Sequence, residues 1–471
     1  MTITQIELTQ RVAAARWAAW APSSRSSCSR SPPDATGAGP VGRHAAKSFA
    51  RLRGILSESL DPKRIRMLLA IVNAKVVPVE GEEFEGTILV RDGRIAELGA
   101  DVTVPDGADV LDVAGAQVTP GLVDAHVHLG VHPEGDGPTA NDTNEMTNPN
   151  TAGVRTIDAI DPFDEGFDLA LAGGVTTVNV NPGSGNPIGG QATTLHTHGR
   201  IVDHMVLREP AGVKSALGEN PKRVYGEKKV TPSTRMGTAK ILRDAFVAAQ
   251  NYQRRLADPE NDRTHDVDLT MEALVKVLRR EIPWRQHAHR ADDIVTALRL
   301  QAEFGYDLII DHGTEAHVVA DLLAERGVPV LIGPLFTTKS KMELRKRSIA
   351  NPGKLARAGV ELSLITDHPV IPISFLVHQA SLAVREGLDR ETALRAITIH
   401  PAKALGVAGE VGSLEVGKRA DIVVWGGDWM DPMARPRTVL IDGRVVFEHD
   451  AATGEERVAS RDEVPLALPT A

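Results

Sequence analysis

The sequence predicts an α/β protein in which a (β/α)8 TIM barrel carries a small β-sandwich domain made from both ends of the chain. β-rich segments stand at 67–98 and again at 421–447. Between them about eight short apolar strands alternate with helical segments over roughly 280 residues, the size of such a barrel. A doubly wound sheet would show the same alternation. Histidine or aspartate at the ends of four strands favours the barrel, whose active sites lie at the carboxyl ends of the strands.

The small domain is predicted from segments 67–118 and 412–460. Apolar runs surround Asp92-Gly93 in the first segment and Asp442-Gly443 in the second. Asp-Gly between apolar runs is a strong hairpin signal. We therefore expect the two segments to form one β-rich domain beside a barrel that occupies residues 119–411.

The barrel strands are expected at 118–127, 174–180, 192–197, 211–216, 286–288, 307–311, 328–332 and 360–366. The third and fourth are the weakest patterns. Helical periodicity fills most of the intervals, most clearly at 239–256, 292–304 and 315–326. Strands that alternate with helices favour a parallel sheet, which brings the carboxyl ends of the strands to one face.

The composition sets limits on function. A chain of 471 residues with 42% hydrophobic and 24% charged residues suits a large domain plus a smaller one. The net charge of -9 argues against nucleic acid as a partner, and no apolar run is long enough to span a membrane. The single cysteine, Cys28, excludes an intramolecular disulfide and fits the cytoplasm. We expect a small-molecule substrate, and the sequence leaves a homo-oligomer open.

Residues 1–66 differ from the rest of the chain. They contain 11 Lys and Arg against 4 Asp and Glu, and they are rich in Ser, Arg and Pro without sustained periodicity. A disordered tail, a transit-like peptide and an over-extended reading frame all fit this composition. We expect a disordered or artefactual extension, because strong folding patterns begin only near Met67.

Histidines at strand ends indicate the chemistry. His126 and His128 end the first barrel strand, and residues two apart on a strand point to the same side. His287 ends the fifth strand, His312 the sixth and Asp367 the eighth. Nitrogen and carboxylate ligands on one face suit zinc or a similar divalent ion.

These motifs resemble a known family. The stretch 121–128 resembles the first-strand motif of the amidohydrolase superfamily, and 398–406 with 412–421 resemble its C-terminal signature. The resemblance covers about 67–448 and is closest to the imidazolonepropionase-related branch, which includes metal-dependent dipeptidases. It implies that Asp367 and His312 are catalytic, and that the metal ligands include His126, His128, His287, His312 and Asp367.

The fourth strand leaves the number of ions open. Many members of the superfamily carry a carboxylated lysine there that bridges two ions, and Lys214 is the expected counterpart. A charged lysine in an apolar strand is costly, whereas carboxylation makes it an oxygen ligand. Glu219 is an alternative source of the carboxylate, and an ordinary surface lysine is a third interpretation.

The residues expected to contact the substrate are His196, His198, Glu219, Tyr225, Arg235, His289 and His368. His196 and His198 form a third alternating pair, which fits a pocket lining, an extra ligand or a solvated strand end. Tyr225 and Arg235, with Arg155, are candidates for anchoring a substrate carboxylate.

These residues predict hydrolysis of a C–N bond, an amide or cyclic amide of a small molecule or a dipeptide, by metal-activated hydroxide. Asp367 is expected to transfer the proton, and the metal with His289 or His368 to stabilise the oxyanion. A deaminase of the superfamily usually has Glu where this chain has Arg290. Imidazolonepropionase, an Xaa-Pro-type dipeptidase and a non-catalytic amidohydrolase-like scaffold remain alternatives.

Overall fold

The computed structural model describes residues 67–135, 137–257 and 266–461, which form part of one compact unit. The predicted extension at 1–66 lies outside the described residues. The division into a small domain and a barrel stays a prediction. Within the described ranges, none of the helices is both long and apolar enough to cross a membrane.

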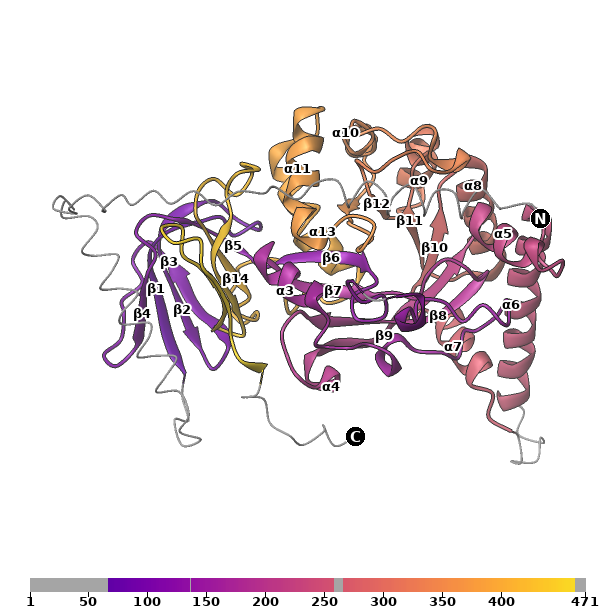
Figure 1. The fold of residues 1–471 in the computed structure, drawn as a ribbon, viewed down its shortest axis with the longest axis horizontal. Coiled ribbons are helices and arrows are strands. Elements are labelled where there is room, and N and C mark those ends of the chain that lie inside the picture. Colours follow the sequence, from indigo (N-terminus) through magenta and orange to yellow (C-terminus); the bar gives the residue numbers. More distant parts are fainter. Residues whose placement is uncertain (1–66, 136, 258–265, 462–471) are drawn as a thin grey trace, which may run out of the picture. The chain divides into compact units, whose positions relative to one another are not determined.

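One sheet, sheet A, contains strands from both ends of the described chain, which lie side by side in Figure 1. β5 joins the two sets, since it pairs parallel with β1 and antiparallel with β14. The arrangement as a β-sandwich stays a prediction. The strands are β1 (Leu68–Val76), β2 (Phe84–Arg91), β3 (Arg94–Gly99), β4 (Asp109–Asp112), β5 (Gln117–Pro120), β14 (Ile422–Trp425), β15 (Pro436–Ile441), β16 (Arg444–His449) and β17 (Glu456–Val458).

A second sheet, sheet B, holds the eight remaining strands in the order β13-β12-β11-β10-β9-β8-β7-β6. It curves back on itself just beyond its two outer strands, because the amide of Asp367 donates to the carbonyl of His126 (3.1 Å) and that of His128 to His368 (2.9 Å). The strands are β6 (Leu122–Val127), β7 (Val175–Val180), β8 (Ile188–His196), β9 (Val206–Ala216), β10 (Trp284–Ala288), β11 (Leu308–His312), β12 (Val330–Ile332) and β13 (Leu362–Leu364).

β8 departs from the predicted regular barrel. It runs antiparallel to both β7 and β9, whereas the other neighbouring pairs of sheet B are parallel. The chain passes from β7 to β8 through a short connection without a helix. The prediction of eight parallel βα units is therefore wrong at the third unit, because alternation along a strand does not reveal its direction.

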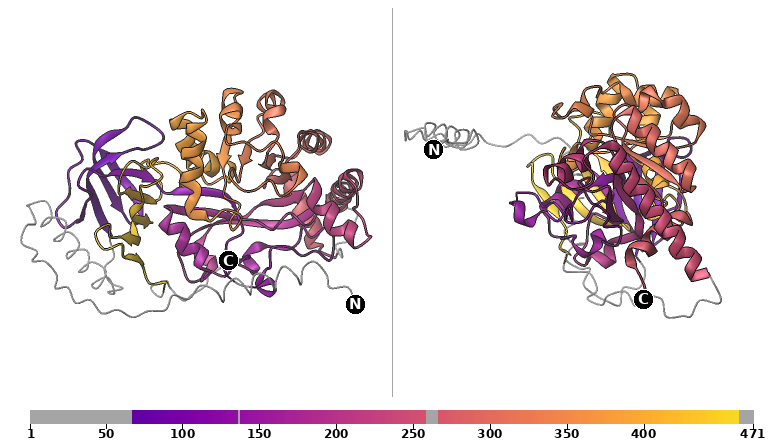
Figure 2. Two further views of the ribbon diagram at one scale, coloured as in Figure 1. Left: turned by 45° about the horizontal axis from the view of Figure 1, so that its top comes forward. Right: turned by 90° about the vertical axis from the view of Figure 1, so that its right-hand side faces the viewer.

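Helices follow the other strands. On the outer side of the sheet, α8 packs against β10 and β11, and α10 and α11 pack against β13 (Figures 1 and 2). Each buries an apolar stripe. On α6, Leu242, Phe246 and Ala249 recur at helical spacing, and Phe246 lies 4.8 Å from the ring of Trp284. The helices are α3 (Glu165–Ala172), α4 (Val202–Met205), α5 (Glu219–Glu227), α6 (Arg235–Ala257), α7 (Leu269–Leu278), α8 (Ala291–Phe304), α9 (Ala320–Glu325), α10 (Asn351–Arg357), α11 (Leu376–Arg385), α12 (Arg390–Arg395) and α13 (Ile399–Ala404).

Five short 3-10 helices complete the described elements, and all of them lie in connections that follow strands of sheet B. They are η1 (Pro138–Ala140), η2 (Thr156–Asp158), η3 (Ala316–Val318), η4 (Met342–Leu344) and η5 (Ile373–Phe375).

Every residue of β6, β10 and β11 is buried, as expected for strands covered on both faces. The buried set nevertheless includes, besides histidines, four ionisable side chains on these and neighbouring strands, Asp124, Lys214, Arg285 and Asp311. A charge without water must be paired, so these side chains indicate a polar centre inside the sheet.

Candidate active site

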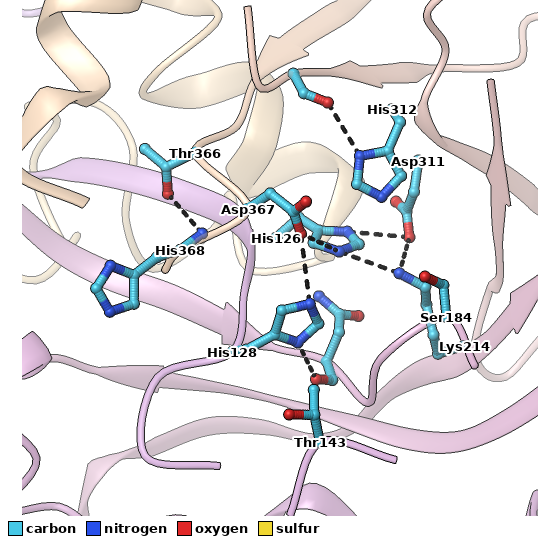
Figure 3. Close-up of polar contacts among 12 residues, drawn as sticks. His126, His128, Thr143, Ser184, Lys214, Asp311, His312, Thr366, Asp367 and His368 are labelled. Carbon is cyan, nitrogen blue, oxygen red and sulfur yellow. Dashed lines mark hydrogen bonds and ion pairs between the residues drawn. The ribbon is translucent and has the colours of Figure 1, made fainter. Parts of the chain in front are cut away.

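The strand-end residues predicted from the sequence meet at the carboxyl ends of sheet B. The register between β10 and β11 places Ala288 opposite His312, and backbone hydrogen bonds connect the ends of β6 and β13. Figure 3 shows side chains from four of these strands or their ends pointing toward one another: His126, His128, Lys214, Asp311, His312 and Asp367.

A first group contains two imidazoles and a carboxylate. Asp367 Oδ1 lies 3.5 Å from His126 Nε2 and 3.4 Å from His128 Nε2. Both separations exceed the usual range of a hydrogen bond. They match the distance of about 3.4 Å between two atoms that bind one tetrahedral ion through bonds of about 2.1 Å. The group therefore has the dimensions of a metal site.

The other nitrogen of each imidazole is held by the protein. His128 Nδ1 donates to the carbonyl of Asn181 (2.8 Å), and His312 Nδ1 donates to that of Gly333 (3.0 Å). His126 Nδ1 lies 3.2 Å from Asp311 Oδ2. Such contacts fix the ring and its tautomer, so that Nε2 is the nitrogen directed into the cluster.

Asp311 was missed by the sequence analysis as a site residue. Its Oδ1 accepts a hydrogen bond from Arg285 Nη2 (2.9 Å), and both side chains are fully buried. Burial alone would raise the pKa of this carboxyl, but Arg285, His126 and Lys214 lower it well below its usual value. Asp311 is therefore a carboxylate that orients His126. A single acidic residue in the apolar strand 308–312 was the available signal.

Lys214 points into the same cluster. Its ammonium donates to His126 Nε2 (3.0 Å) and lies 3.4 Å from Asp311 Oδ2, and the residue is 1% exposed. The interpretation of Lys214 as an ordinary surface lysine is thus wrong. Burial lowers the pKa of Lys214, so its neutral form, which can be carboxylated, is favoured relative to a solvated lysine.

A second group contains His287, His289 and His312, whose ligand atoms all lie within 4.8 Å of one another; His126, His312 and Asp367 satisfy the same limit. Within the described residues, both nitrogens of His287 are buried without a hydrogen-bond partner. Such atoms are rare in folded proteins unless an ion or water binds them. The donors present therefore fit a divalent metal.

Burial favours the neutral form of four imidazoles in the cluster. Burial lowers the pKa of each of His126, His287, His289 and His312. Burial works against ionisation of Asp367, but the neighbouring His312, His128 and His126 outweigh it and lower its pKa. Neutral imidazoles and an ionised carboxylate are the protonation states that a cation requires.

Two residues of the cluster have unusual backbone conformations. His312 has φ 73° and Asp367 has φ 55°, in the left-handed region that residues other than glycine seldom adopt. Each such residue costs on the order of 1–3 kcal/mol, and the cost is tolerated mainly at functional sites. The strain is a separate indication that the placement of these two side chains matters.

Two residues predicted to contact the substrate, His196 and His198, lie away from the cluster. His196 Nε2 lies 2.8 Å from Asp421 Oδ2, and His198 Nε2 donates to the carbonyl of Ala459 (3.1 Å). Because β8 is reversed, its last residue pairs with Thr177 near the start of β7, at the amino end of the parallel strands. The placement of His196 and His198 in the substrate pocket was therefore wrong.

Tyr225 and Arg235 already have partners. The Tyr225 hydroxyl donates to Asn186 Oδ1 (2.7 Å), and Arg235 Nε donates to Asp293 Oδ1 (2.9 Å). Both are structural contacts around α5 and α6, so the predicted carboxylate anchors are not supported. Arg155 likewise pairs with a near neighbour, Asp158, at the surface.

Three other predicted contacts lie near the cluster. His289 Nδ1 contacts Thr314 Oγ1 (2.8 Å). Burial lowers the pKa of His368 to about 4, and its Nε2 lies 3.6 Å from Glu134 Oε1. The amide of Glu219 donates to a residue that the sequence analysis missed, Glu343 (3.0 Å). The charged segment 339–347 gave no signal for Glu343.

A cavity of about 570 Å³ opens beside α5 and η4 and is lined by Glu219, Asn220, Lys222, Arg223, Ser233, Ser340, Lys341 and Met342. Its lining residues follow β9 and β12, so it lies on the face that carries the cluster. Another cavity, of about 590 Å³, lies beside the starts of β11 and β12 and is lined by no residue of the cluster.

The comparisons identify similar proteins. A model of the amidohydrolase family matches residues 264–446. The structure of an amidohydrolase from Thermotoga maritima is 45% identical, with 81% of this chain and 100% of that one covered and a TM-score of 0.79.

Curated relatives are more distant. Amidohydrolase tasK of Hapsidospora irregularis is 31% identical over 392 residues, which are 77% of this chain and 40% of tasK. This chain thus spans less than half of that relative. Imidazolonepropionase of Mesorhizobium japonicum is 27% identical over 379 residues, 72% of this chain and 86% of that protein.

Proposed function

The chain belongs to the amidohydrolase family, and we propose that it uses a bound divalent metal, zinc being expected, to hydrolyse a C–N bond. The bond would be an amide or cyclic amide of a small molecule or dipeptide. The observation that carries the proposal is the convergence of His126, His128, His287, His312 and Asp367 at one face. We further propose the barrel and small-domain division at 67–118, 119–411 and 412–460.

The metal would be held by His126, His128, His287, His312 and Asp367, with Lys214 carboxylated as an oxygen ligand. A divalent ion bound there supplies a Lewis acid and a water that ionises near neutral pH. Asp311 and the carbonyl groups of Asn181 and Gly333 keep the imidazoles in place. The fixed rings need no reorganisation when substrate arrives.

Asp367 is the proposed proton carrier. Its Oδ1 faces the imidazoles of His126 and His128, and its backbone adopts the left-handed conformation. An ionised carboxylate in this position takes a proton from the attacking water and returns it to the leaving nitrogen. His289 and His368 are proposed to bind the developing oxyanion, and Glu219 to contact the substrate.

The relatives support the class of bond. Imidazolonepropionases recur among the curated relatives, at 24–28% identity. The name imidazolonepropionase indicates a cyclic amide as the substrate of those relatives. A dipeptidase would instead hydrolyse an open-chain amide at the same metal site. The two are alternatives within the proposal, and a non-catalytic scaffold is the alternative outside it.

The test uses the double variant His126→Ala/His128→Ala. Wild-type protein and the variant are loaded with zinc, dialysed and analysed for metal, then assayed against dipeptides, N-acyl amino acids and cyclic amides. The wild type is expected to retain metal and hydrolyse a member of the panel, whereas the folded variant loses metal from the first group and all turnover. A wild type that binds metal without hydrolysing any compound would favour the scaffold. A double variant with full metal content would contradict the site.

A further inference from the structure

The buried carboxyl group of Asp124 connects the strand that carries His126 to the segment that carries Asp367. Asp124 is 0% exposed, and its Oδ1 accepts a hydrogen bond from the amide of His126 (3.1 Å). Its Oδ2 accepts one bond from the amide of Thr366 (3.1 Å) and another from the Thr366 hydroxyl (2.6 Å). Donors at two strand ends therefore satisfy a buried polar group that would otherwise be costly.

Hydrogen bonds also hold the residues on both sides of Asp367. Thr366 Oγ1 donates to Asp124 and accepts the amide of His368 (3.2 Å), a bond that Figure 3 shows beside Asp367. The amide of Asp367 itself donates to the carbonyl of His126 (3.1 Å). Thr366 is thus the link between the buried carboxyl group and the backbone on either side of Asp367.

We propose that Asp124 and Thr366 are positioning residues, which hold Asp367 in the left-handed conformation with its Oδ1 facing His126 and His128. The proposal rests on the proposed function, because both residues act through the proton carrier of that reaction. Placement of such a group matters, since a displacement of about 1 Å can lower turnover roughly 10²-fold.

The backbone of Asp367 requires this support. Its φ of 55° lies in the left-handed region, where a residue with a Cβ atom is strained. A strained conformation persists only where the surrounding structure over-determines it. The bonds of Asp124 and Thr366 restrain the backbone immediately before and after Asp367, so they are suited to that role.

The strand that carries Asp124 is itself irregular. The pairing of β6 with β7 shifts register between Asp124 and Val127, the interval that contains His126. Such irregularities redirect side chains next to active sites. Because the amide of His126 bonds to Asp124 within this interval, the same carboxyl group restrains the backbone of a proposed metal ligand and of the proton carrier.

The first experiment removes one hydroxyl group from the full-length protein. Thr366→Val keeps the shape of the side chain but loses its bonds to Asp124 and His368. Thr194→Val is the matched control, since Thr194 is also 0% exposed and its hydroxyl donates to Asn179 Oδ1 (2.8 Å). Both variants are loaded with zinc and assayed on a compound that the wild type hydrolyses. We expect kcat of Thr366→Val to fall roughly 10²-fold at unchanged KM and metal content, and Thr194→Val to keep the kcat of the wild type.

A double variant identifies the residue through which Thr366 acts. If Thr366 positions Asp367, its loss has little further effect once Asp367→Asn has removed the proton carrier. The kcat of Asp367→Asn/Thr366→Val should therefore match that of Asp367→Asn, whereas independent roles would multiply the two losses. Thr366→Ser restores a hydroxyl group and should recover most of the turnover. Multiplied losses, or a Thr366→Ser variant as impaired as Thr366→Val, would overturn the proposal.

Crystal structures give a readout that requires no turnover. In Thr366→Val, Asp367 is expected to leave the left-handed region or to move its Oδ1 by more than about 1 Å relative to His126, while Thr194→Val keeps the wild-type position. Asp124→Asn covers a failure of Thr366→Val to fold, because an amide has one accepting oxygen in place of two. An unmoved Asp367 in the folded variants would overturn the proposal, whatever their turnover.

The outcomes separate this proposal from the proposed function. A wild type that hydrolyses no compound would contradict the hydrolase, and the position of Asp367 in the crystal structures would still decide the role of Asp124 and Thr366. A folded Thr366→Val variant with the kcat of Thr194→Val would overturn the positioning role and leave the hydrolase intact.

Discussion

Replacement of Asp367 by Asn tests the proton carrier while leaving the size of the side chain unchanged. Asn accepts hydrogen bonds but takes no proton at neutral pH. We expect turnover to fall on the order of 10²–10⁴-fold, the usual contribution of positioned acid–base catalysis. The histidines still bind the ion, so most of the metal is expected to remain.

The effect on stability follows from the contacts of Asp367. Its Oδ1 lies 3.4 and 3.5 Å from two imidazole nitrogens, beyond a good hydrogen bond, and its backbone amide bond to His126 is unaffected by the substitution. The change should cost less than about 1 kcal/mol. A loss of that size lowers Tm by roughly 2–4 °C in a domain of 150–250 residues.

The assay compares kcat/KM, metal content and Tm for Asp367→Asn with those for Asp164→Asn. Asp164 is also buried, but its carboxylate accepts the amides of Gly130 (2.9 Å) and Glu134 (3.0 Å) and does no proposed chemistry. That variant should lose about 1–3 kcal/mol of stability and keep its turnover when folded. Turnover of Asp367→Asn within a few-fold of the wild type would refute the reasoning and transfer the proton role to His289 or His368.

Two further predictions concern buried charged pairs, one that supports the candidate site and one at the amino end of the parallel strands. Arg285→Met leaves Asp311 buried without its close partner and should lower the free energy of unfolding, measured with denaturant, by about 3–5 kcal/mol. The control Arg243→Met breaks a half-exposed pair with Glu303 (2.7 Å) and should cost less than about 1 kcal/mol. Equal losses in the two variants would contradict this reasoning. His196 has a raised pKa: burial opposes its charge, and so does Arg419, but Asp421 and Asp442 outweigh both. The His196–Asp421 pair is expected to contribute about 1.5–3 kcal/mol to the free energy of unfolding. This contribution is complete below the unfolded pKa of 6.5 and is lost as pH rises through the higher folded pKa. The difference in stability between wild type and His196→Gln should therefore shrink from pH 5.5 to 9, and a difference independent of pH would contradict the pairing.

Much of the candidate site was determined by the sequence alone. The spacing of His126 and His128 on an apolar strand, and the strand-end positions of His287, His312 and Asp367, were sufficient to predict that these side chains share a face. The reason is local: side chains alternate along a strand, and the ends of parallel strands meet at one edge. Lys214 followed the same logic, since it lies on an apolar strand.

Only the tertiary structure decided the rest. The reversal of β8 carries His196 to the amino end of the neighbouring strands, and no residue of the strand itself encodes that direction. Glu343 comes from a charged connection after β12 and reaches His289 only because the connection folds over the sheet. Arg285 and Asp311 pair across two strands whose register is set by the whole sheet. Strand direction, loop path and burial depend on contacts between distant segments, so a residue's own neighbours in sequence do not specify them.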